Sequence, residues 1–104
     1  MERIGYKVVT EKMESLGLRK NPNILTFVIG QWTELNEDQI KPGKSDWGGI
    51  WLARGYGGAN TLRKYMREKY DINTLIYLTN IGIVLFENSY RIKTNKVMLI
   101  SKLD

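Results

Sequence analysis

One stretch of the chain, residues 47–70, constrains the fold more than any other. It reads WGGIWLARGYGGANTLRKYMREKY, which predicts a strand over 49–54, a glycine turn over 55–58 and a helix over 59–70. Such a helix must bury its apolar face against a sheet, because it follows a strand through a tight turn. The apolar residues of this face recur at three- and four-residue spacing; they are Ala59, Leu62, Tyr65, Met66 and Tyr70.

The first half of the chain contains two further apolar segments. Residues 4–9 are rich in β-branched side chains and predict a strand. Thr10 then suits the N-cap of a short helix over 11–16, which Gly17 would end. Residues 24–32, ILTFVIGQW, predict a second strand. The polar residues 33–46 lack periodicity and predict a long surface loop.

The last thirty residues indicate three or four short strands. The clear segments are 75–78, 82–86 and 96–100, and 90–93 is a further candidate. Short turns separate them, so neighbouring strands should be antiparallel, because a parallel pair needs a long crossover. Residues 82–86 are apolar without alternation, which predicts a central strand covered on both faces.

These elements predict one α+β domain that spans residues 1–104. A chain of 104 residues buries one modest core. Apolar residues make up 42% and charged residues 26%, as in ordinary globular proteins and unlike disordered ones. We expect an antiparallel or mixed sheet of about five strands, with the 59–70 helix on one face and a short N-terminal helix.

The chain has no cysteine and no histidine. Thiolate nucleophiles, cysteine zinc sites and the commonest general base are therefore excluded, which argues against many classes of enzyme. We expect neither a cofactor nor a metal. Apolar runs are too short for a membrane helix, and the N-terminus lacks the continuous apolar segment of a signal peptide. The chain therefore reads as a cytoplasmic protein, in the host cytoplasm if it is viral.

A candidate anion site lies at the start of the helix. Helix N-termini present free N–H groups, and Arg54 at the end of the strand suits a phosphate clamp beside Gly57 and Gly58. The sequence GYGGAN matches neither the Walker loop nor the dinucleotide-binding motif. The alternative is that these glycines only make the turn from strand to helix.

A second candidate is a basic helix face that would follow a nucleic-acid backbone. The formal net charge is +5, and between residues 47 and 70 five basic residues face one acidic residue. Aromatic residues nearby would stack on bases; they are Trp47, Trp51 and Tyr56. The alternative is a solvated helix face with these aromatics in the core. The basic residues of this candidate are Arg63, Lys64, Arg67 and, from the C-terminal region, Lys96.

A third candidate is acidic. Carboxylates that share one loop can hold Mg²⁺ or Mn²⁺, although no spacing here matches a known metal loop. The residues in question are Glu34, Glu37, Asp38 and Asp46.

Two resemblances bear on function. The small basic chain, rich in Lys, Ile, Asn and Tyr, resembles in composition the orphan proteins of archaeal viruses and phages, many of which bind nucleic acid or block host factors. A fainter likeness is to ADP-ribosyltransferase-like domains. It rests on Tyr6-Lys7-Val8-Val9 as their early strand, with Lys7 in place of the family's Arg or His, and on Glu87 as the late glutamate.

Three functions follow as hypotheses. The first is a non-enzymatic protein that binds nucleic acid through the basic helix face. The second is a protein-interaction module or homo-oligomer, such as a homodimer, that uses exposed aromatics and sheet edges. The third is a small enzyme that acts on a phosphorylated or nucleotide substrate, which would need a pocket joining the glycine turn to a carboxylate.

Overall fold

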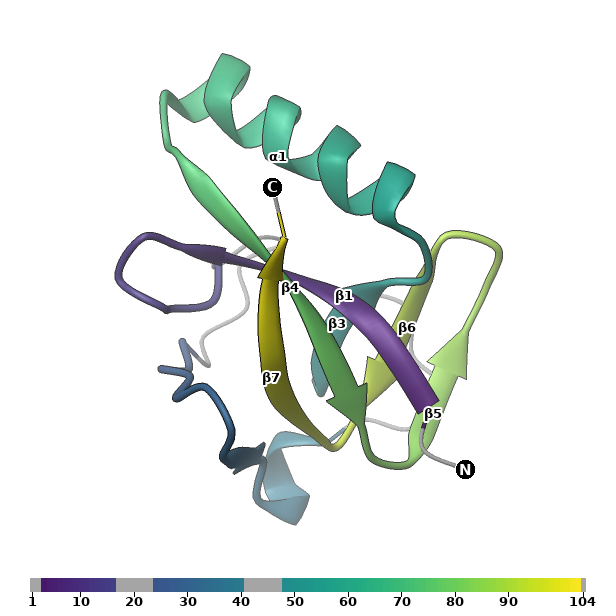
Figure 1. Ribbon diagram of the computed structural model, residues 1–104. Helices are drawn as coiled ribbons and strands as arrows, with labels where there is room; N and C mark the ends of the chain where they lie inside the picture. Colours follow the sequence, from purple (N-terminus) through teal and green to yellow (C-terminus); the bar gives the residue numbers. More distant parts are fainter. Residues whose placement is uncertain (1–2, 17–23, 41–47, 104) are drawn as a thin grey trace.

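A computed structural model describes residues 3–16, 24–40 and 48–103 of the chain. Within them, seven strands form one antiparallel sheet in the order β2-β7-β4-β1-β3-β6-β5 (Figure 1). The expected α+β class is therefore seen, with seven strands in place of about five. The strands are β1 (Arg3–Thr10), β2 (Trp32–Glu34), β3 (Ile50–Ala53), β4 (Thr74–Ile81), β5 (Val84–Glu87), β6 (Arg91–Thr94) and β7 (Lys96–Leu103).

One α-helix, α1 (Tyr56–Tyr70), lies across one face of the sheet against β1, β3 and β4 (Figure 1). Its small apolar contact consists of Val8, Ala59 and Ile76, with half-buried residues such as Leu62 around them. The helix starts three residues earlier than predicted, because glycines in an exposed first turn do not prevent helix formation. It ends at Asp71, which takes the left-handed conformation of a C-cap.

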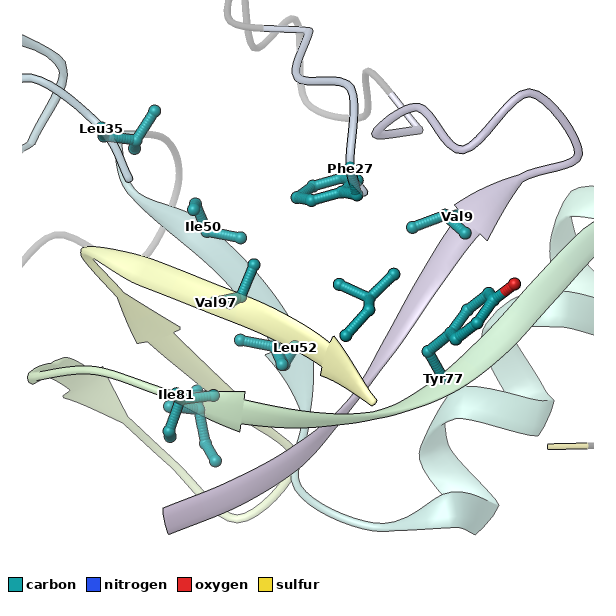
Figure 2. Packing of buried hydrophobic residues seen from close by; sticks show 10 residues of the cluster. Val9, Phe27, Leu35, Ile50, Leu52, Tyr77, Ile81 and Val97 are labelled. Atoms are coloured by element: carbon teal, nitrogen blue, oxygen red, sulfur yellow. The ribbon is translucent and has the colours of Figure 1, made fainter. Parts of the chain in front are cut away.

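The larger core lies on the other face of the sheet (Figure 2). Successive strand residues point to opposite faces, so Val9 and Tyr77 contribute to this core while Val8 and Ile76 face α1. The segment 24–40 covers it with Phe27 and Leu35. The rest of the cluster comes from the sheet: Ile50, Leu52, Ile81, Ile92, Val97 and Leu99.

The prediction of a helix over residues 11–16 is wrong. Thr10 Oγ1 accepts the backbone N–H of Glu14 at 3.1 Å, one residue beyond the N–H groups that an N-cap side chain binds. The chain turns at Met13, where φ is 64°, and Glu14 forms an isolated bridge with Thr26. Pairing with the distant segment therefore overrides the local helix signal. Gly17, the predicted stop, lies outside the described residues.

The strand predicted over residues 24–32 is also largely wrong. Phe27 is buried, but Val28 and Ile29 are exposed, and Gly30 at φ 82° turns the chain before β2 begins at Trp32. The segment contacts the core through individual side chains, such as Phe27, and not as a regular strand. The predicted loop 33–46 begins with the end of β2 and then a 3-10 helix, η2 (Glu37–Gln39). Its residues 41–46 lie outside the described parts.

The segment predicted as a central strand, residues 82–86, forms the edge strand β5. Its side chains are half-buried, and Ile83 before it is 65% exposed. The missing alternation has another cause: the β5–β6 register shifts between Val84 and Phe86, which disturbs the regular in-out pattern. Strands β4, β6 and β7 overlap the other predicted segments and run beyond them. No helix in the described parts of the chain is long and apolar enough to cross a membrane.

Candidate functional site

The basic residues predicted on the helix meet in one pocket. Arg63, Lys64 and Arg67 line a cavity of about 300 Å³ between the C-terminal half of α1 and the chain that returns from it into β4. Here this cavity is called the α1 pocket. Its remaining lining residues are Glu68, Ile72, Asn73 and Thr74. The pocket therefore combines three cations with one carboxylate, which favours an anionic ligand.

Neutral side chains hold both arginines of the α1 pocket. Arg63 donates to the amide oxygen of Asn60 at 2.5 Å, and Arg67 donates to that of Asn73 at 2.7 Å. An amide oxygen orients a guanidinium without cancelling its charge, and each guanidinium keeps further N–H donors for a ligand. Asp71 approaches Arg67 only at 3.7 Å and is largely exposed, so its effect is weak.

The side chains of Lys64 and Thr74 have no hydrogen-bond partner among the residues that the structure describes. Lys64 is exposed, where this is ordinary. Thr74 is only 7% exposed, and its Oγ1 is buried without a partner. A buried hydroxyl without a partner costs roughly 1–3 kcal/mol, so Thr74 is an unusual residue for the wall of this pocket. Sequence reasoning missed it, since one threonine at the start of a strand carries no local signal.

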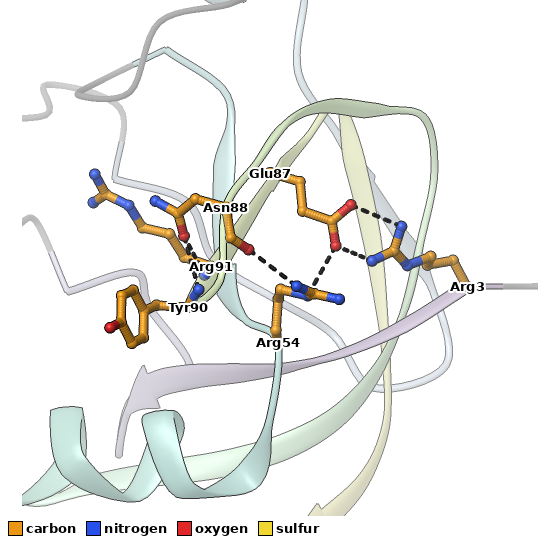
Figure 3. A network of polar contacts seen from close by, with 6 residues as sticks. All are labelled: Arg3, Arg54, Glu87, Asn88, Tyr90 and Arg91. Atoms are coloured by element: carbon orange, nitrogen blue, oxygen red, sulfur yellow. Dashed lines mark hydrogen bonds and ion pairs between the residues drawn. The ribbon is translucent and has the colours of Figure 1, made fainter.

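At the predicted anion site, the glycines lie within the helix and Arg54 is bound by other protein groups. Gly57 and Gly58 lie inside the first turn of α1, after Gly55 as the N-cap. Arg54 binds Glu87 at 2.9 Å and donates to the Asn88 carbonyl at 3.3 Å (Figure 3). Its guanidinium is thus held by protein groups near the start of the helix, while the α1 pocket lies towards the other end.

Glu87 is the centre of a small ion-pair network (Figure 3). Arg3 and Arg54 both contact its carboxylate. The hydrogen bond from Arg3, helped by the charges of both arginines, lowers the pKa of Glu87. The ADP-ribosyltransferase likeness would place Glu87 with Lys7 in a site. Lys7 instead donates to the Trp51 carbonyl at 2.8 Å, under Phe27.

Lys96 does not join the α1 pocket. Its ammonium lies over the ring of Trp32, 4.6 Å from the centroid, at the start of β7. The neighbouring Val97 pairs with Ile81 at the end of β4, whereas the pocket residue Thr74 begins β4. Seven residues of strand separate the two sites, or roughly 23 Å at 3.3 Å per residue.

The aromatic residues available for stacking are also different from those predicted. Trp47 lies outside the described residues, Tyr56 packs edge-on against Tyr6, and Trp51 is half-buried beside Phe86. The aromatics of α1 that do reach solvent are Tyr65 and Tyr70, which were predicted on its apolar face; they are 41% and 46% exposed. They contact each other, and the Lys69 ammonium lies over both rings.

Two lysines are buried in the sheet, which sequence reasoning did not predict. Burial lowers the pKa of Lys7 to about 8. Lys93 is fully buried and lies near the Trp51 ring, over which the Arg91 guanidinium packs at 4.4 Å. Lys7 lies on the same face of β1 as the core residue Val9, whereas Lys93 lies on the opposite face of β6 from the core residue Ile92.

The described acidic residues that were proposed as metal ligands do not cluster in the structure. Glu34, Glu37 and Asp38 are exposed, and Asp46 lies outside the described residues. Within residues 3–16, 24–40 and 48–103, no three acidic side chains gather as metal ligands would.

Comparison of the chain with protein-family models, with curated proteins and with solved structures finds no match. The functional reading therefore depends on the geometry and charge of the chain's own residues.

Proposed function

We propose that the protein is a non-enzymatic nucleic-acid-binding protein, with its phosphate contacts on the basic flank of α1. The observation that supports this proposal is the convergence of Arg63, Lys64 and Arg67 on the α1 pocket. Phosphate oxygens are strong acceptors for guanidinium and ammonium groups, and the two arginines are already oriented by Asn60 and Asn73. Exposed Tyr65 and Tyr70 on the same helix offer ring faces for unpaired bases.

Binding of this kind is weak and salt-dependent. With one to three phosphates neutralised, log Kd for a single strand should change with log salt with a slope of about 0.7 to 2, since each contact contributes roughly 0.7. Nonspecific affinities at physiological salt lie at about 10⁻⁶ to 10⁻⁴ M. Fluorescence anisotropy with labelled single-stranded DNA, duplex DNA and RNA at increasing salt measures both quantities.

Two matched variants locate the interface. Lys64→Gln removes an exposed charge that lines the pocket, and Lys102→Gln removes an exposed charge from β7. Lys102 pairs with Tyr77, whose side chain lies in the core on the face away from α1. We expect Lys64→Gln to weaken binding about fivefold, the effect of roughly 1 kcal/mol, and Lys102→Gln to change it little. The absence of binding to every nucleic acid at low salt would refute the proposal.

Self-association is the second candidate function. Ile4, Asn80, Met98 and Trp32 lie side by side across four strands, so their side chains share the face on which α1 packs. Ile4 and Trp32 are nevertheless exposed, because α1 does not extend over them. Light scattering distinguishes this function: a dimer that becomes monomeric on Trp32→Lys favours it, and a monomer at high concentration excludes it.

A further inference from the structure

We propose that the α1 pocket binds a terminal phosphate monoester, the phosphorylated end of a nucleic-acid strand. This inference rests on the proposed function and specifies which group of the partner the pocket recognises. A cavity of about 300 Å³ is at the small end of ligand sites and has room for one nucleotide.

The charge distribution favours a single phosphate over a long backbone. A strand that follows a protein surface needs a continuous series of cations. Here Arg54 is held by Glu87, and Lys96 lies on Trp32 far from the pocket. The pocket cations are concentrated around one cavity. A phosphate monoester carries about −1.5 to −2 charges near neutral pH, more than the single charge of a backbone diester, and so gains more from three clustered cations.

The hydroxyl of Thr74 is the second observation that points to a ligand. Thr74 lines the pocket, is more than nine-tenths buried, and has no hydrogen-bond partner for Oγ1 in the described parts of the chain. A valine of the same shape would avoid this cost at the start of a strand. Oγ1 itself is buried, so we expect a bound phosphate to draw the hydroxyl into the pocket by a rotation about χ1.

The other lining residues fit a nucleotide end. Ile72 is a partly exposed apolar side chain against which a sugar or base can pack. Among the described residues, Glu68 is the one carboxylate that lines the pocket, and it repels phosphate. Replacement of this residue, Glu68→Gln, should therefore tighten binding of a phosphorylated end.

The experiment compares single-stranded oligonucleotides of one sequence that end in 5′-phosphate, 3′-phosphate or hydroxyl, each labelled at the opposite end. Anisotropy at one salt concentration gives the affinities, and unlabelled adenosine monophosphate serves as competitor. We expect one phosphorylated end to bind about tenfold more tightly than the hydroxyl end, which corresponds to 1.4 kcal/mol.

Thr74→Val and Thr74→Ser form the matched pair of variants. Valine should abolish the preference for phosphate and raise Tm, because it removes an unpartnered buried hydroxyl. Serine should keep the preference. A thermal melt of each variant shows that it is folded.

Each outcome is decisive. Equal, salt-sensitive affinity for all ends overturns the terminal-phosphate inference and leaves nucleic-acid binding in place. Direct binding of adenosine monophosphate in a calorimetric titration, lost in Thr74→Val, without oligonucleotide binding overturns nucleic-acid binding and supports a phosphate monoester site. A phosphate preference that survives in Thr74→Val overturns the role of that hydroxyl. No binding of any probe overturns both proposals.

Discussion

At the scale of single residues, the buried Lys7 should make stability depend on pH. Its pKa is lowered from 10.5 to about 8 by burial, so between these values the unfolded chain holds a proton that the folded chain has lost. Stability should therefore rise with pH across this window, by up to about 3 kcal/mol, since one pKa unit corresponds to roughly 1.4 kcal/mol.

Urea unfolding of the protein and of Lys7→Met over this pH range tests the expectation. The methionine variant should lose the rise, whatever its stability near neutral pH, because its loss of the bond to the Trp51 carbonyl does not depend on pH. If the free energy of unfolding changed with pH in the same way in both proteins, burial of Lys7 would not be the cause of the rise.

Glu87 should make stability depend on pH in acid, whereas Lys7 does so in alkali. Its pKa is lowered in the folded protein, first by the hydrogen bond from Arg3, so its contribution is present above the ordinary carboxyl pKa and is lost as pH falls through the folded value. Glu87→Gln should lower the urea midpoint slightly at neutral pH and have no effect in strong acid. A difference between the two proteins that persists unchanged in strong acid would show that packing, not charge, is responsible.

At the scale of elements, two glycines that look alike in sequence should respond oppositely to alanine. A Cβ on Gly57 meets nothing within 4 Å, and the residue lies in the first turn of α1. A Cβ on Gly49 would lie 2.7 Å from Cγ of the buried Lys93, at a backbone φ of +108°. Gly57→Ala should stabilise by about 0.5–1 kcal/mol, and Gly49→Ala should destabilise by about 1–3 kcal/mol.

Urea midpoints of both variants measure these changes. A midpoint lowered by Gly57→Ala would show that α1 does not start at Tyr56. A midpoint raised by Gly49→Ala would show that Gly49 does not lie against Lys93.

Elements with a regular local pattern could be predicted from sequence, and elements anchored by distant contacts could not. The helix and the strands β1 and β3 follow directly from apolar spacing. The segment 24–40 does not, because Phe27 and Leu35 reach the core one at a time. Residues 11–16 fail as a helix because Glu14 pairs with Thr26, a contact that no local window contains.

At the scale of the whole molecule, the sequence predicted the cations of the candidate site but not its pocket. Arg63, Lys64 and Arg67 follow from helical spacing. Asn73 and Thr74 join them only because the chain reverses after Asp71 and enters β4 beneath the helix. Arg54 was predicted at the anion site beside the glycine turn, and Lys96 in the basic face; the fold gives each a different neighbour, Glu87 and Trp32.

If the proposed function is right, nucleic acid contacts α1 and the chain that returns from it into β4. Two-dimensional NMR of the ¹⁵N-labelled protein during titration with a 5′- or 3′-phosphorylated oligonucleotide tests it most directly. The largest amide shifts should fall between residues 60 and 74, with Thr74 among them, and should vanish at high salt. Shifts centred on the row from Ile4 to Trp32 or on edge strand β5, or none at all, would contradict it.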